Sequence, residues 1–234
     1  MTTNQTNNSV ILCGTVKGEP VYSHEVFGEK FYEVMLAVKR LSGMDDVLPV
    51  SVSEHLLGDG FRDGCEVTVK GQFRSYNKIV GERSKLMLTV FVRDVEPFDP
   101  TVNPNTMQLS GFICKPPVYR TTPFNREICD LLVAVNRQYN KSDYIPCIVW
   151  GRNARFAEKL AVGQHIDIVG RVQSRNYQKR LDDDTVVTRT AYEVSVGKIS
   201  IADDSIVSAT ETSESDVADG VTEVGELHAG IQIL

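Results

Sequence analysis

The second half of this 234-residue chain repeats the first half at a nearly constant distance along the sequence. At a distance of 97 residues, the matching pairs include Gly14 and Gly111, Pro20 and Pro117, Tyr22 and Tyr119, Ala37 and Ala134, Arg40 and Arg137, and Pro49 and Pro146. At a distance of 99 residues, they are Gly64 and Gly163, Gly71 and Gly170, Ser75 and Ser174, and Asn77 and Asn176. Repetition at one period is the signature of a duplicated structural unit. The chain is therefore predicted to contain two copies of one domain.

A proline-rich segment separates the two halves. The stretch EPFDPTVNPN contains three prolines, which favours an extended linker. The polar start MTTNQTNNS and the acidic end, which has no Lys, Arg or aromatic residue, are both predicted to be disordered. The predicted organisation is a disordered N-terminus at 1–9, a first domain at 10–96, a linker at 97–105, a second domain at 106–202 and an acidic tail at 203–234.

Each half has the pattern of a small all-β domain. In the second half, RNARFAEKLA places Phe156 and Leu160 four residues apart, as an amphipathic helix would. The strand-like runs are MQLSGFIC, ICDLLVAVNR, DYIPCIVW, HIDIVGRVQSRNY and RTAYEVSVGKISI. Five strands with a helix after the third fit the OB fold, a Greek-key barrel, although the periodicity also allows another small barrel. We predict an all-β protein with two tandem five-stranded OB-fold barrels, each with one short helix.

The net charge of −6 hides three unlike segments. Residues 1–104 carry 11 Lys and Arg against 14 Asp and Glu, a net −3. Residues 105–202 carry 14 against 9, a net +5, and residues 203–234 carry none against 8. The second domain is therefore the part suited to an anionic partner.

The orientation of Trp150, the only tryptophan, follows from comparing the two halves. Period-two geometry places Trp150 and Tyr144 on one face of the third strand, but both faces of this strand are apolar. In the first half, the matching faces are Val47, Pro49, Ser51 and Ser53 on one side, and Leu48, Val50 and Val52 on the other. Because a register slip would bury the hydroxyls and expose the aliphatic side chains, we expect the Ser-bearing face, and with it Trp150 and Tyr144, to point outward.

The fourth strand of the second half adds cations to the same surface. Ile166, Ile168 and Val172 are predicted to point inward, which leaves Arg171, Gln173, Arg175 and Tyr177 on the other face. Aromatic rings that stack on unpaired bases, with cations for the phosphates, bind single strands without sequence choice. The competing interpretations are a tryptophan in the core and an ordinary solvated strand face.

No feature of the sequence indicates catalysis or a metal site. The four histidines lack ligand or triad spacing, and Asp182, Asp183 and Asp184 form a loop run without further ligands. The five cysteines lack CxxC spacing and fit reduced, buried thiols. No apolar run reaches the length of a membrane span, and no leader is recognised. We expect a cytoplasmic protein without enzymatic activity, metal or cofactor.

The second half resembles the bacterial single-stranded DNA-binding protein (SSB) family through PVYRTTPFNREICDLLVAVNR, DYIPCIVWGRNARFAEKL and VGQHIDIVGRVQSRNY. The four places at which this family carries stacking aromatics fall on Tyr139, Tyr144, Trp150 and Tyr177. The resemblance implies an OB barrel that coats exposed single strands during replication, recombination and repair. The residues expected to bind single-stranded DNA are Trp150, Tyr144, Tyr177, Tyr139, Arg171, Arg175, Arg137, Arg152 and Lys179.

The first half resembles the same family more loosely. Its matching stacking places fall on Ser42, Val47, Ser53 and Lys78, none of which is aromatic. Together with the net charge of −3, this predicts a first barrel that has lost most of the stacking surface. Arg74, Tyr76 and Lys78 are expected to give weaker binding.

Two further expectations follow from the resemblance. Family members present four barrels, so a chain with two barrels is expected to form a homodimer. Family tails dock replication and repair proteins through an acidic Pro-Phe tip, whereas this chain ends in Ile-Gln-Ile-Leu. Partner binding through the tail is therefore an open question. The alternative functions are an accessory factor whose first domain binds a protein partner, and an RNA-binding OB protein.

Overall fold

Five strands of the first half form one barrel in the computed structural model, which describes residues 7–81, 83–180 and 185–202. A single 3₁₀ turn, η1 (Asp59–Phe61), takes the place of the predicted helix. The strands are β1 (Asn8–Val26), β2 (Glu29–Lys39), β3 (Asp45–Ser53), β4 (Glu66–Val80) and β5 (Arg83–Pro97). β1 begins inside the segment 1–9, which was expected to be disordered, because its first residues pair with a strand of the second half.

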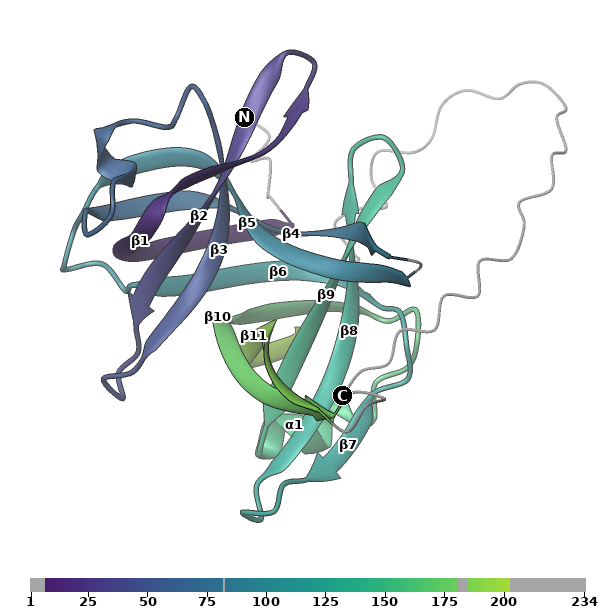
Figure 1. Ribbon diagram of the computed structural model, residues 1–234. Helices are drawn as coiled ribbons and strands as arrows, with labels where there is room; N and C mark the ends of the chain where they lie inside the picture. The colour runs from purple at the N-terminus through teal and green to yellow at the C-terminus, as the bar shows by residue number, and fades with distance from the viewer. Residues whose placement is uncertain (1–6, 82, 181–184, 203–234) are drawn as a thin grey trace, which may run out of the picture. The chain divides into compact units, whose positions relative to one another are not determined.

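The second half forms a second barrel of the same order (Figure 1). Its elements are β6 (Asn105–Ile113), β7 (Val118–Thr121), β8 (Glu127–Arg137), β9 (Lys141–Trp150), α1 (Arg152–Ala157), β10 (His165–Arg180) and β11 (Val186–Ile201). The short strand β7 was not predicted. The matching residues of the first half are part of the long strand β1, which shifts register where it bends. The all-β, OB-type fold is confirmed.

Each barrel closes through one parallel strand pair, β3 with β5 and β9 with β11. The first strand of each barrel passes close to the second, and a glycine makes this approach possible. A Cβ on Gly14 would lie 2.4 Å from the carbonyl oxygen of Ala37, and one on Gly111 would lie 2.5 Å from that of Ala134. Only glycine fits such contacts, which explains why this pair recurs in both halves.

The predicted inward faces form the two cores. Leu48, Val50 and Val52 are fully buried, as expected for that face of β3. The expectation of an open opposite face was wrong, because Ser51 and Ser53 are each only 8% exposed. Their register partners on the neighbouring strands are the rings of Phe91 and Phe31. We infer that these large side chains cover the two hydroxyls. In the second barrel, Ile148 on the outer face of β9 is also buried.

The helix α1 is shorter than predicted and buries other residues. It ends at Ala157 instead of Ala161, and its buried side chains are Ala154 and Ala157. Phe156, which was expected to anchor it, is 39% exposed, whereas Leu160 beyond its end is buried. Small side chains on the buried face let this single turn and a half lie close to β8 and β9.

The two barrels are joined into one continuous sheet. β1 pairs antiparallel with β6 from Asn8 opposite Leu109 to Leu12 opposite Asn105, so β6 lies between β1 and β10 (Figure 1). The side chains of Asn8 and Asn105 each bond both backbone groups of one residue, Phe73 and Val172 respectively. Each pair of contacts lies within one barrel, and the two pairs repeat the internal duplication. The domain boundaries remain a prediction.

A buried carboxylate from each barrel bonds to the other barrel. Asp46 accepts hydrogen bonds from Arg40 of its own barrel and from Arg171 at 2.9 Å and the Ser174 backbone N–H at 2.7 Å in the second. Its counterpart Asp143 accepts a bond of 2.8 Å from the Ser75 backbone N–H and lies 3.2 Å from Arg137. One Asp143 oxygen has no partner among the described residues, so the two sites differ in strength.

We predict that stability falls in acid because of Asp46. Burial alone would raise the pKa of this carboxyl, but the hydrogen bond from Arg40, the Ser174 N–H and the charges of Arg40 and Arg171 lower it below the ordinary value of 3.8. A carboxyl with a depressed folded-state pKa stabilises fully above its unfolded-state pKa and loses this contribution as pH falls through the folded-state pKa. Urea denaturation from pH 7 to pH 2 should show a loss below about pH 4. Asp46→Asn should lack this component, and an identical pH profile in both proteins would contradict the prediction.

Candidate nucleic-acid interface

Trp150 ends β9 and points outward. Its side chain is 37% exposed, and its indole N–H donates to the Ser195 hydroxyl of β11 at 3.3 Å. The next residue, Gly151, has a φ of +56°, which turns the chain sharply into α1. The indole is therefore held at one edge by β11 and accessible to solvent elsewhere. The prediction that Trp150 lies outside the core is confirmed.

A hollow of about 510 Å³ lies beside the indole, and we call it the Trp150 hollow. Its wall contains two arginines that the sequence analysis did not select. Arg155 is held by both oxygens of Glu127 at 2.8 Å, whereas Arg126 is exposed and forms no ion pair with any described residue. The lining residues are Thr121, Asn125, Arg126, Glu127, Trp150, Gly151 and Arg155. The Trp150 indole and cationic side chains from the β7–β8 loop and α1 therefore line the same hollow.

The outer face of β10 and β11 carries a chain of polar contacts. Arg171 donates to Gln173 at 2.9 Å, and Gln173 donates to Glu193 at 2.7 Å. Arg175 lies 3.5 Å from Glu193 and 5.9 Å from the ring centre of Tyr177. Glu193 was not predicted, and its charge offsets part of the positive charge of this face. Arg175 is thereby positioned over Tyr177.

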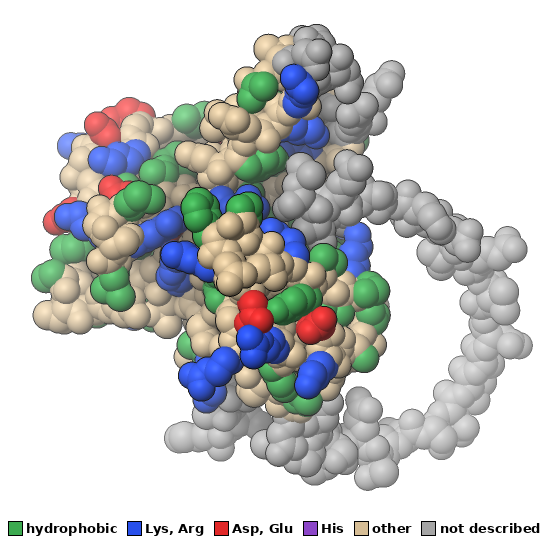
Figure 2. All heavy atoms as spheres, turned by 90° about the horizontal axis from the view of Figure 1, so that it is seen from below, with side chains coloured by type: hydrophobic (Ala, Val, Ile, Leu, Met, Phe, Trp, Pro, Cys, Tyr) green, Lys and Arg blue, Asp and Glu red, His purple; other side chains and the backbone are tan. Residues whose placement is uncertain are grey.

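The predicted cations differ in whether they form ion pairs within the protein. Arg171 and Arg137 form ion pairs with the buried Asp46 and Asp143. Arg152, two residues after Trp150, is exposed, and Lys179 is half-buried. Neither side chain forms an ion pair with a described residue. Figure 2 shows Lys and Arg side chains spread across the middle of the face drawn there, with apolar side chains between them. The run of Asp182, Asp183 and Asp184 lies outside the described residues.

The predicted aromatics lie along the surface instead of converging on one pocket. Tyr144 is 42% exposed, and its backbone N–H bonds the Ser75 hydroxyl of the first barrel at 2.8 Å. It lies six residues before Trp150 on the same strand, about 20 Å away at the rise of a β-strand. Tyr139 lies in the β8–β9 turn with a φ of +62° and is 89% exposed. Such spacing suits an extended ligand better than a compact one.

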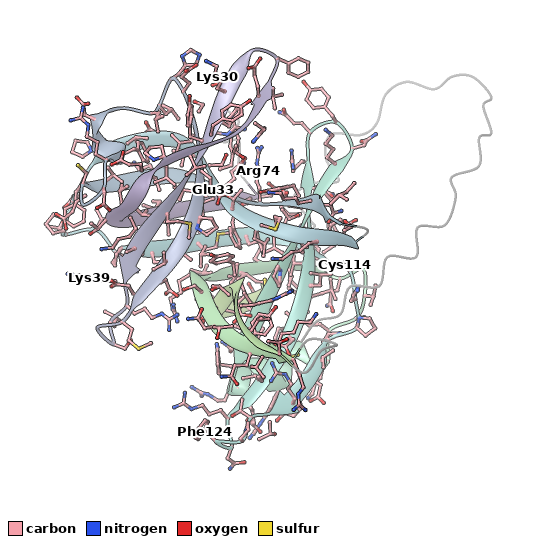
Figure 3. The ribbon with its side chains drawn as sticks, viewed as in Figure 1. Lys30, Glu33, Lys39, Arg74, Cys114 and Phe124 are labelled. Atoms are coloured by element: carbon pink, nitrogen blue, oxygen red, sulfur yellow. The ribbon has the colours of Figure 1, made fainter. Side chains whose placement is uncertain are left out.

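The predicted first-barrel residues share one groove. Arg74, Tyr76 and Lys78 lie on β4 and line a groove of about 620 Å³ on the outer face of that barrel. Arg74 is labelled in Figure 3 next to Glu33, the acidic residue in the same lining. The sequence analysis selected these three residues but not the aromatic rings that lie beside them.

The described residues contain no candidate metal site and no disulfide. Among them, no group of three or more His, Cys, Asp and Glu side chains could hold a metal ion. The five cysteines are free thiols, and burial raises the pKa of Cys129 to about 11. In the part of the chain that the structure covers, no helix has the length and apolar character needed to cross a membrane.

Comparison with known proteins identifies the second barrel. Residues 104–202 match the Single-strand binding protein family. Single-stranded DNA-binding protein 1 of Lactococcus lactis is 34% identical over 91 residues, which cover 36% of this chain and 61% of that protein. Single-stranded DNA-binding protein 1 of Streptococcus pyogenes is 31% identical over 96 residues, which cover 38% of this chain and 74% of that protein.

Solved structures extend the likeness over both barrels. The wild-type single-stranded DNA binding protein from Thermus aquaticus matches with a TM-score of 0.64 at 18% identity, covering 91% of this chain and 96% of that one. A deletion mutant of the same protein matches with a TM-score of 0.62 at 20% identity, covering 83% and 94%. At such identities the likeness shows the fold alone. The family match and the sequence relatives show that the chain belongs to the bacterial single-strand binding protein family.

Proposed function

We propose that this protein binds single-stranded DNA without sequence preference, mainly through the outer face of the second barrel. The observation that carries the proposal is the exposed indole of Trp150 beside the arginine-lined Trp150 hollow. An accessible ring next to cations is the arrangement that holds an unpaired base by stacking and its phosphate by charge.

The proposed contacts follow the surface from one end of β9 to the other. One base stacks on Trp150, and its phosphate lies near Arg126 and Arg152. Further bases stack on Tyr144 and Tyr177, and Arg175 lies between these bases and the DNA backbone. Stacking on a ring accepts every base, because each has a π-face, so the surface has no means of selecting a sequence. Duplex DNA is excluded because its bases are already stacked on one another.

The proposed cellular role is protection of exposed strands during replication, recombination and repair, without catalysis. A homodimer of the two-barrel chain would present four barrels, and we propose this as the working assembly. The tail at 203–234, which lies outside the described residues, is proposed as the segment that docks replication or repair proteins. With 8 acidic residues and no Lys or Arg, it would repel the strand, which favours such a separate role.

A fluorescence titration of the full chain with oligo-dT tests the proposal. Because Trp150 is the only tryptophan, its emission reports one place, and stacking against a base should quench it. Duplex DNA of the same length should leave the emission nearly unchanged at equal salt. Oligo-U serves as the arm that distinguishes DNA from RNA binding. Binding of oligo-dT without any change in emission would remove Trp150 from the interface.

A further inference from the structure

The groove on the first barrel contains an aromatic ring that the sequence comparison did not select. We call this groove the Phe91 groove, after the half-buried phenylalanine of β5 that lines it. Arg137 and Lys141 also line it, although they belong to the β8–β9 hairpin of the second barrel. Both barrels therefore build this groove, and the hairpin supplies cations to a face of the first barrel.

Two guanidinium groups lie over Phe91. The guanidinium carbon of Arg74 is 4.4 Å from the ring centre, and that of Arg93 is 4.9 Å away. The ring of Phe31 lies 5.6 Å from Phe91, and His24 stacks on Phe31 at 5.1 Å. Planar cations against an aromatic ring are mutually stabilising, and they present charge next to a flat surface.

The position of Phe91 corresponds to that of Ser195 in the second barrel. In the parallel pairs that close the barrels, Ser51 lies opposite Phe91 and Ile148 lies opposite Ser195. Ser51 and Ile148 are equivalent, because they are separated by the repeat distance of 97 residues. Their partners on the fifth strand are therefore equivalent too.

The two barrels have exchanged an aromatic residue and a serine between neighbouring strands. The second barrel has Trp150 on its third strand, bonded to Ser195 on its fifth. The first barrel has Ser53 in place of Trp150 and Phe91 in place of Ser195. A comparison restricted to the four family positions finds no ring in the first barrel, because its ring lies one strand away.

The Phe91 groove gathers positive charge with little acid to offset it. Neither Arg74 nor Arg93 forms an ion pair with a described carboxylate, and the Nε of Arg74 is buried without a hydrogen-bond partner. Burial, together with the charges of Arg137 and Arg93, lowers the pKa of Arg74 to about 10.

The first barrel lacks an acidic residue that the second barrel has at the matching position. Glu193 lies opposite Gln173 in the second barrel, whereas Thr89 lies opposite Arg74 in the first. Glu33 is the acidic residue in the lining of the Phe91 groove, and it forms no ion pair with a described residue. Asp143 pairs with Arg137 and its charge also acts on Arg74, but Arg74 and Arg93 have no ion-pair partner among the described residues. Partly desolvated cations that crowd one another favour an anion that can reach several of them, as a phosphate backbone does.

We propose that the Phe91 groove is a second site for single-stranded DNA, in which a base takes the place of one of the two guanidiniums over Phe91 and stacks on the ring, while the adjoining phosphates lie between Arg74 and the β8–β9 hairpin. The hairpin cations, Arg137 and Lys141, make this a composite site that needs both barrels. The inference rests on the proposed function, but it assigns the first barrel a stacking residue of its own.

A moved tryptophan tests the site in the full chain. In the double variant Trp150→Phe and Phe91→Trp, the only indole lies in the Phe91 groove. Oligo-dT of about 32 nucleotides, twice the largest site size of one OB fold, should quench it. The matched control is Trp150→Phe with Val162→Trp, because Val162 is 54% exposed and lies outside both sites. Its indole should keep its emission.

The two proposals fail separately in this design. Quenching of Trp150 in the natural chain without quenching of the indole at 91 overturns the composite site and leaves the proposed function intact. Absence of oligo-dT binding by the natural chain, measured by anisotropy of the labelled oligonucleotide, overturns the proposed function. If the double variant does not fold, Phe91→Ser decides, since serine occupies the equivalent position in the second barrel. It should weaken binding of the same oligonucleotide about fivefold, the lower end for loss of one stacking ring. Unchanged affinity overturns the composite site.

Discussion

Trp150→Ala should weaken the binding of oligo-dT by about 5- to 150-fold, because each base stacked on an aromatic ring contributes roughly 1 to 3 kcal/mol. Fold stability should change much less, because the indole is 37% exposed and the core of the second barrel is made by other residues. Trp150→Phe should recover most of the affinity, since phenylalanine keeps a stacking face without the N–H that bonds Ser195.

The matched control for this variant is Phe27→Ala. Phe27 is a fully exposed aromatic residue at the β1–β2 turn that lines neither proposed site, although its neighbour Val26 lines the Phe91 groove. Its loss removes a similar surface ring and should leave affinity unchanged. Binding is measured by fluorescence anisotropy of a labelled oligo-dT, because the variant lacks the intrinsic reporter. Equal affinities for Trp150→Ala and the natural chain would show that stacking at this place does not contribute.

Asp46→Ala should lower the free energy of unfolding by about 3 kcal/mol, the lower end of the cost of breaking a buried ion pair. Asp46 is fully buried and accepts bonds from Arg40 and Arg171, whereas the two arginines keep partial contact with water. Alanine leaves both guanidiniums and the Ser174 backbone N–H without their shared acceptor. Since these donors come from both barrels, we expect one cooperative transition at lower urea, measured by circular dichroism.

Two controls isolate the effect. Asp45→Ala removes an exposed carboxylate one residue away and should be nearly neutral. Asp143→Ala removes the equivalent carboxylate of the other barrel and should cost less than Asp46→Ala, because Asp143 pairs with one arginine and leaves one oxygen without a partner. A loss for Asp46→Ala no larger than that for Asp45→Ala would show that the two-barrel contact adds nothing to stability.

Properties that repeat along the chain were predictable. The duplication, the strand order and the burial of Leu48, Val50 and Val52 all follow from spacing, because a strand alternates sides every residue. The outward direction of Trp150 was predicted correctly from the same alternation, although the two serines that supported it are covered in the structure. The family assignment needed only the second half, where the match is strongest.

Properties that depend on neighbouring strands were not predictable. Strand β7 pairs with β8 alone and has no fully buried side chain, so it leaves no clear periodic signal. The coverage of Ser51 and Ser53, and the contact of Glu193 with Gln173, depend on the register between neighbouring strands, which the alternation within one strand does not give. Arg126 could have been suspected from the polar loop TTPFNRE, but nothing in that loop indicates that it lies beside Trp150.

The sequence by itself determined that the chain has two all-β units of one kind, that the second is the more basic, and which face of each third strand is core. Alternation and repetition are local properties, and burial of apolar side chains enforces them wherever the strand lies. Only the tertiary structure decided that Asp46 bonds Arg171, 125 residues away, and that a hairpin of the second barrel lines the groove beside Phe91. These contacts depend on how one barrel docks on the other, and no periodicity within either half records that.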